Sequence, residues 1–479
     1  MYIHGDTKHA NTYKVASLLG FMLLFPVVVL EILNSTLLGG EIIPWSLIIV
    51  LLLLLVYIYV KIGNNCVISP IPWFLLACAI YYGIGPLLFI YGNEASIEYV
   101  NQFHLVSEEM YAKTNLLNGI SICLVLAFIV ITFQFKFKSL PKHQTSDQVL
   151  IQFAKYMSLI GFIFEGLTQY LRFMGGEMFV MPGIFYILRD FKNTGLFLYG
   201  LLYFRGHKSV SKYFFIMLVF NWIIAITGLM KQEIIEYFLM IFFAYILSKK
   251  RNFFATILPV ILVLLTYQPL TILTPVLRNV FWNSKAELDS GYSIINLYNK
   301  FNTKSSELYS TNRQYLWIRI NYTSQQAFAM EQYDLGLPGK SFGNVMWAFV
   351  PRILYPDKPI ITLGEEFTNL ANGRASGSGG TSPGAFGEGY WNEGWFGVVI
   401  VCSLLGFLLS VVTQYSNTVI DKNKFHYFPL IIIMLKIGYR IDDWFVATCI
   451  NSIPMCIFSL FIIIIIYKII KKGRVQEIK

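Results

Sequence analysis

Long apolar runs constrain this chain more than any other feature of its sequence. They recur from the first tens of residues to the last, and many approach 20 residues. An α-helix needs about 20 apolar residues to cross a hydrocarbon core of about 30 Å. Hydrophobic residues make up 56% of the chain and charged residues 13%, which excludes an ordinary water-soluble domain. We therefore predict an all-α, polytopic integral membrane protein.

The apolar runs predict about twelve membrane-spanning helices. They cover positions 14–33, 43–61, 69–91, 113–134, 150–171, 184–204, 211–230, 232–248, 253–274, 394–415, 427–447 and 453–470. Basic loops follow every second span, so they all fall on one side of the membrane together with both termini. The positive-inside rule makes this side cytoplasmic. The net charge of +10 then reflects topology, and we expect no nucleic-acid partner.

The topology divides the chain into three parts. Residues 1–274 form an N-terminal membrane bundle, 275–393 a large extracytoplasmic loop, and 394–479 the last spans and a cytoplasmic tail. A loop of this length usually has a function of its own. Within it, apolar positions in 311–333 predict a helix along the membrane surface, and 373–380 (GRASGSGG) predicts a mobile loop. The six cysteines lie in or beside spans without metal-ligand spacing, so we expect neither disulfides nor a metal site.

The stretch 347–397 of the large loop concentrates the candidate chemistry. Prolines flank Arg352 and Lys358 in VPRILYPDKP, and they hold the local backbone in a fixed geometry. Two cations held in this way suit a diphosphate, whose negative charge they would stabilise in a transfer reaction without a metal or other cofactor. The alternative is that both side chains reach lipid headgroups where the loop returns to the membrane.

The segment GEGYWNEG supplies a second set of candidates. Glu388 is a candidate general base for an acceptor hydroxyl, with Glu365 as a rival. Tyr390 is a candidate for stacking on a sugar ring, and Asn392 for a further substrate contact. The alternative is a helix start, in which Asn392 or its neighbour caps a span that begins near Gly394.

Ionisable residues interrupt several predicted spans. They are Glu165; Arg189, Asp190 and Lys192; Lys231 and Glu233; and Lys436, Arg440, Asp442 and Asp443. Such groups cost about 2.5–3.5 kcal/mol each at membrane depth, so they usually face a polar cavity or one another. By the predicted topology they all lie toward the outer side. For Lys231 with Glu233 the alternative is an ordinary polar turn, and for Arg440 with Asp442 a structural ion pair.

These residues resemble those of a known family. VPRILYPDKP, followed by TSPGAFGEGYWNEGWFG, is similar to the distal loop of Wzy-type O-antigen and oligosaccharide repeat-unit polymerases. TGLMKQEIIEYF resembles the family's glycine-then-cation opening of a middle span, with Lys231 where arginine is more usual. YRIDD, with Arg440, resembles its late-span arginine-plus-acid element, and Arg319 in WIRINY is similar to a further family arginine. The resemblance is specific over only part of the chain.

The resemblance implies a glycosyltransferase of the polytopic class that uses polyprenyl-linked sugars, often called GT-C-like. Such an enzyme transfers a growing glycan from undecaprenyl diphosphate to a lipid-linked repeat unit at the outer face of the bacterial cytoplasmic (inner) membrane. Arg352, Lys358, Arg440 and Lys231 would hold diphosphates. The product would be O-antigen, capsule or another polysaccharide, and a chain-length regulator protein is a possible partner.

Two alternative functions stay open. An O-antigen ligase is expected to use a histidine in the large outer loop, and 275–393 contains none. A lipid-linked oligosaccharide flippase or other transporter fits the number of spans. Transporters usually have repeated halves, however, and the sequence shows no internal repeat.

Overall fold

The computed structural model describes residues 5–33, 40–135, 145–175, 183–228, 231–249, 313–350, 355, 358, 362–373 and 380–477. Every regular element in these ranges is helical. The helices are α1 (Gly5–Leu33), α2 (Ile42–Ile62), α3 (Pro70–Cys78), α4 (Leu88–Tyr91), α5 (Glu94–Asn101), α6 (Glu108–Thr132), α7 (Asp147–Gly175), α8 (Gly183–Arg205), α9 (Ser211–Gly228), α10 (Lys231–Ser248), α14 (Tyr315–Ile320), α15 (Thr323–Asp334), α16 (Val345–Ala348), α17 (Leu363–Asn372), α18 (Gly384–Asp421), α19 (Phe428–Tyr439) and α20 (Asn451–Glu477). Short 3-10 and π turns join some of them.

Eight helical segments of the described ranges are long and apolar enough to cross a membrane. They are His9–Leu33, Ile42–Ile68, Pro70–Tyr91, Glu108–Thr132, Asp147–Leu171, Lys208–Ala225, Gly384–Asp421 and Val446–Lys472. Two shorter apolar helices, Ile234–Ser248 and Phe425–Tyr439, match further predicted spans. The all-helical, multi-pass architecture is therefore confirmed. The count of about twelve spans stays a prediction, because 253–274 lies outside the described residues.

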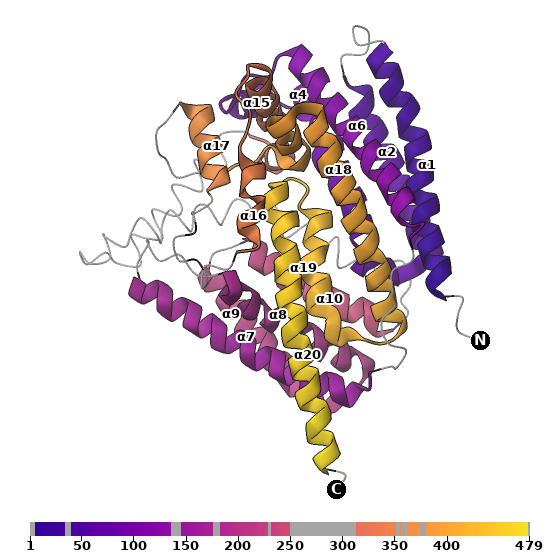
Figure 1. The fold of residues 1–479 in the computed structure, drawn as a ribbon, viewed down its shortest axis with the longest axis vertical. Helices are drawn as coiled ribbons and strands as arrows, with labels where there is room; N and C mark the ends of the chain where they lie inside the picture. Colours follow the sequence, from indigo (N-terminus) through magenta and orange to yellow (C-terminus); the bar gives the residue numbers. More distant parts are fainter. Residues whose placement is uncertain are drawn as a thin grey trace.

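Two hydrophobic cores organise the bundle. One core joins α1, α2, α3, α6 and α18, where α6 packs against both α1 and α18. The second core joins α7 to α10 with α19 and α20, and α8 packs between α7 and α10. Figure 1 shows α1, α2 and α6 side by side on one flank and α7 to α9 on the other, with α18, α19 and α20 between them. The last three helices therefore connect the two halves of the bundle.

Two helices of the predicted large loop lie at one end of the bundle. These helices, α15 and α17, lie at the upper end in Figure 1, whereas α20 leads to the C-terminus at the opposite end. The predicted surface helix over 311–333 is wrong in two respects. The helix breaks at Asn321 and Tyr322 into α14 and α15, because the Asn321 carboxamide oxygen accepts the backbone N–H of Thr323 at 3.0 Å. Most of α15 is also buried, where it packs against α6 and α18.

The predicted span over 427–447 is also wrong in its length. Helix α19 has 12 residues, which is about 18 Å and too short to cross a membrane. The chain turns at 440–443 and returns through α20. Gly438 allows this short helix to pack closely, because a Cβ there would lie 2.5 Å from the Pro70 carbonyl oxygen. The turn between α19 and α20 is consequently recessed below the end of the bundle at which α15 and α17 lie, as Figure 1 shows.

Candidate functional site

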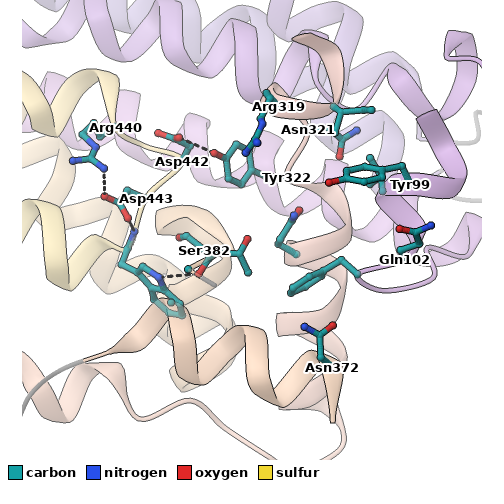
Figure 2. Close-up of a pocket in the computed structure, with 18 residues that line it drawn as sticks. Tyr99, Gln102, Arg319, Asn321, Tyr322, Asn372, Ser382, Arg440, Asp442 and Asp443 are labelled. Atoms are coloured by element: carbon teal, nitrogen blue, oxygen red, sulfur yellow. Dashed lines mark hydrogen bonds and ion pairs between the residues drawn. The ribbon is translucent and has the colours of Figure 1, made fainter. Parts of the chain in front are cut away.

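A cavity of about 660 Å³ opens above the recessed turn. Its walls come from the end of α5 and the residues after it, from α14 and α15, from α17, and from the chain before α18 (Figure 2). The side chains and backbone that line it belong to Tyr99, Val100, Gln102, Phe103, Ile318, Arg319, Asn321, Tyr322, Gln325, Gly364, Asn372, Gly380, Thr381, Ser382, Arg440, Asp442, Asp443 and Trp444. The cavity thus joins segments from the start, middle and end of the chain.

The turn after α19 provides the charged floor of the cavity. Arg440 Nη2 lies 2.8 Å from Asp443 Oδ2. Asp443 also accepts the Trp444 backbone N–H at 2.8 Å and the Thr448 hydroxyl at 2.9 Å, so it is fixed from two sides. Burial lowers the pKa of the Arg440 guanidinium, but Asp443, together with Tyr439, Asp442 and Glu236, more than offsets that effect and holds the pKa above its ordinary value. Arg440 therefore stays charged and in a defined orientation.

Asp442 is the second carboxylate of this floor, and no cation of the described residues pairs with it directly. Its Oδ2 accepts the Tyr322 hydroxyl at 2.8 Å, a contact that joins the turn to the start of α15. Burial raises the pKa of the Asp442 carboxyl, the hydrogen bond from Tyr322 opposes that rise, and the neighbouring Asp443 adds to it. A carboxylate with a raised pKa in a cavity is the arrangement expected of a general base.

Arg319 supplies an available cation. It lies at the end of α14, lines the cavity and is exposed. No ion pair among the described residues uses its guanidinium, in contrast to Arg440. Arg319, Tyr322 and Asp442 all line this cavity, and Figure 2 draws their side chains. An exposed guanidinium in this place can bind an anionic group of a ligand in a bidentate manner.

An aromatic cluster holds α17 against the cavity. Leu363 and Phe367 of this helix are buried, and the Phe367 ring packs against Phe103, Phe328, Trp391 and Trp444 at centroid distances of 5.8, 5.3, 5.1 and 5.5 Å. Gly364 allows the chain at 380–381 to approach, since a Cβ there would lie 3.0 Å from the Gly380 Cα. The position of α17 as a cavity wall is thereby fixed.

Glu388 occupies a different place from the one expected of a general base. It is 0% exposed and does not line the cavity. Its Oε2 accepts the backbone N–H of Phe445 in a short hydrogen bond and that of Val446 at 3.4 Å. These N–H groups open the helical segment that follows the recessed turn. Glu388 therefore caps that segment from beneath and fixes the backbone after Asp443.

Tyr390 and Asn392 are also framework residues. Tyr390 is 5% exposed and its hydroxyl donates to Asp334 at 3.0 Å. Asn392 donates to the Ser341 hydroxyl at 2.8 Å and accepts the Phe342 N–H at 3.1 Å. Neither side chain lines the cavity, so the expected sugar stacking and substrate contact do not occur in this geometry.

The glycines of this segment serve helix packing. Gly394 has φ +58°, and with Glu393 it interrupts the helical backbone of α18. A Cβ on Gly397 would lie 2.0 Å from the Gly389 carbonyl oxygen. The glycines thus allow the chain to kink and close on itself, which agrees with the alternative of a span that begins near Gly394.

The remaining candidates lie apart from the cavity or outside the described residues. Lys358 is half-buried and donates to the Val350 carbonyl oxygen at 3.1 Å, and Glu365 is exposed on α17. Neither lines the cavity. Lys231 and Glu233 lie at the start of α10, but their side chains are outside the described part. Arg352 lies wholly outside it.

The charges within the spans do face one another. Glu165 of α7 pairs with Lys192 of α8 in a short contact and lies 3.7 Å from Arg189 Nε. Lys436 of α19 lies 3.6 Å from Glu236 of α10 and 3.9 Å from Asp190 of α8. Since Lys436 is one turn before Arg440, this network reaches the cavity floor. It balances three cations with three carboxylates, so each charge has an opposite partner within the bundle.

Sequence reasoning found Arg319, Arg440 and Asp442 but missed most of the cavity. The missed residues are Tyr99, Gln102, Phe103, Asn321, Tyr322, Gln325, Asn372, Thr381, Ser382 and Trp444. They come from short segments between spans and follow no repeated spacing. The cluster of polar residues at 321–326 (NYTSQQ) between apolar positions was the one available signal.

The chain matches no family model, no curated protein and no solved structure.

Proposed function

We propose that the protein is a membrane glycosyltransferase of the repeat-unit polymerase type. It transfers a growing glycan from undecaprenyl diphosphate to a lipid-linked repeat unit at the outer face of a bacterial cytoplasmic membrane, and a chain-length regulator is a candidate partner. One observation carries the proposal: a cavity at the end of a multi-pass bundle is lined both by an available cation, Arg319, and by a carboxylate with a raised pKa, Asp442. The resemblance of the distal-loop motifs supports it.

Each cavity group has a role in this reaction. Asp442 accepts the proton of the acceptor hydroxyl, whose oxygen then bonds to the anomeric carbon of the donor sugar. The bond between that carbon and the phosphate oxygen breaks, and the diphosphate leaves with the electron pair. Arg319 binds the leaving diphosphate and stabilises its growing charge. Arg440, held by Asp443, adds positive potential at the floor. The sequence motif VPRILYPDKP keeps Arg352 and Lys358 as candidates for further contacts with the diphosphate.

The fate of repeat units in a deletion strain tests the proposal. Surface glycan is separated by gel, and lipid-linked intermediates are extracted and analysed. A polymerase predicts single, unpolymerised repeats on the surface acceptor. Long chains retained on the lipid carrier would instead indicate a ligase. Single lipid-linked units that accumulate on the cytoplasmic side would indicate a flippase, and either result would reject the polymerase.

Replacement of Arg319 by alanine should lower the transfer rate about a hundredfold, because an unpaired cation no longer stabilises the diphosphate. Arg319→Lys should recover part of the rate, since it restores charge without the bidentate fork. Lys340→Ala is the control: this exposed cation follows α15 and does not line the cavity. The measurement is kcat/KM for purified protein with lipid-linked repeats. Equal rates for Arg319→Ala and wild type would remove Arg319 from the mechanism.

Transfer should continue after chelation of divalent cations. The proposed charge stabilisation comes from Arg319 and Arg440, which bind phosphate oxygens without a bridging metal. The measurement compares polymer formation by purified protein before and after treatment with EDTA. A loss of activity that magnesium or manganese restores would contradict this mechanism.

A further inference from the structure

The cavity has two ends of different chemistry. Arg440, Asp442 and Asp443 lie at one end, and Tyr99, Gln102 and Asn372 lie at the other, as Figure 2 shows. Arg319 and Tyr322 lie between them. The described side chains that line the second end carry no full charge. We call this group, Tyr99, Gln102 and Asn372, the amide end of the cavity.

The amide end presents unused hydrogen-bonding groups. Gln102 and Asn372 are exposed and come from different parts of the chain, and their carboxamides make no hydrogen bond to the other described residues. Each carboxamide offers two donors and an acceptor, and so matches a hydroxyl that both donates and accepts. Tyr99 is 40% exposed and adds an aromatic face with a polar tip. Nearby, the Gln325 carboxamide oxygen is buried without a described partner.

Other groups in this region are already occupied. Asn321 uses its amide nitrogen to donate to the Gly85 carbonyl oxygen at 2.8 Å and its oxygen to accept from Thr323. Ser382 accepts the Gly384 N–H at 3.0 Å. One face of Tyr99 is covered by the Arg313 guanidinium at 4.7 Å. The groups left for a ligand are thus the carboxamide that follows α5, the carboxamide at the end of α17, and the free part of one ring.

We propose that the amide end is a subsite for an uncharged sugar ring of the glycan. This inference rests on the proposed glycosyl transfer and names the group that binds next to the reacting centre. Sugar hydroxyls satisfy the carboxamides of Gln102 and Asn372, and the apolar face of the ring packs on Tyr99. An acyl chain would displace water from both amides without replacing its hydrogen bonds, which is unfavourable. An acidic sugar would find its cation at Arg319 instead.

The test uses the free repeat-unit oligosaccharide, released from its lipid diphosphate by mild acid. It can occupy a sugar subsite but has no diphosphate for Arg319. Binding to purified protein is measured by calorimetry. We expect Gln102→Ala and Asn372→Ala each to weaken its binding about tenfold, the loss of roughly one good hydrogen bond. Asn369→Ala is the matched control, because Asn369 lies on the same helix and does not line the cavity.

Three outcomes would overturn the subsite. The free oligosaccharide could fail to bind wild-type protein, both amide variants could bind it as wild type does, or Asn369→Ala could weaken binding as much as Asn372→Ala. Binding needs no turnover, so the result is separate from the polymerase test. If the protein binds the sugar through these amides but forms no polymer, the subsite is supported and the proposed function is rejected.

Kinetic measurements distinguish the two possible sources of the sugar. Preformed long chains on the carrier serve as donor, and single lipid-linked repeats serve as acceptor. A rise in KM for the single repeat in Gln102→Ala and Asn372→Ala assigns the amide end to the acceptor. A rise in KM for the long chain assigns it to the transferred glycan. Unchanged KM values for both substrates would reject the subsite.

Discussion

Replacement of Asp442 by asparagine should lower the rate of glycan transfer by about two to four orders of magnitude, the usual effect of removing a general base. The shape of the cavity is kept, because asparagine can still accept the Tyr322 hydroxyl through its carbonyl oxygen. Substrate binding should change little. The measurement is single-turnover transfer by purified protein, with kcat and KM determined separately. A variant with near wild-type kcat would show that another group accepts the proton.

The pH dependence gives a second readout of the same residue. Asp442 must be ionised to accept a proton, and burial raises its pKa above the ordinary range. The transfer rate should therefore rise with pH through that pKa and fall as the pH decreases below it. Tyr322→Phe removes a hydrogen bond that favours the ionised carboxylate, so this limb should move to higher pH. In Asp442→Asn the limb should disappear. A limb that persists there would belong to another residue.

Replacement of Glu388 by alanine should destabilise the protein by about 3 kcal/mol, because it leaves a void and removes the acceptor of two buried N–H groups. The turn at 440–443 should lose its position, so transfer should fall with stability. The measurement is the apparent Tm in detergent together with the rate of transfer.

Glu388→Gln separates the positioning role from the expected chemical one. Glutamine keeps a carbonyl oxygen that can accept from Phe445 and Val446, so most of the stability and activity should remain. A general base at this position would lose its function in the same variant. If the Glu388→Gln protein is stable but inactive, Glu388 takes part in the reaction itself.

The charged floor of the cavity could be predicted because charge is rare in apolar segments. Arg440 and Asp442 were conspicuous within a predicted span, because ionisable groups at membrane depth are costly and usually functional. The same reasoning found the partners of the buried network, such as Lys192 and Lys436. It could not show where α19 ends. That depends on Gly438 meeting Pro70, which is distant in sequence.

The amide end could not be predicted for a different physical reason. A single Gln102 or Asn372 in a connecting segment looks like any solvated side chain, and only the fold brings the two to one cavity. The segment with Glu388 had the opposite problem. Closely spaced glycines indicate close approach, but they do not say whether a ligand or another part of the same chain approaches. Here the backbone at Gly389 packs closely against the backbone at Gly397, so the approaching group is another part of the same chain.

The short α19 also has a consequence for biogenesis. A segment of 12 residues that carries Lys436 is a poor substrate for insertion into the bilayer by itself. It must enter as a hairpin with α20, and its lysine must find Asp190 and Glu236, which belong to helices made earlier. The floor with Arg440 and Asp442 is therefore completed only after the preceding helices are in place.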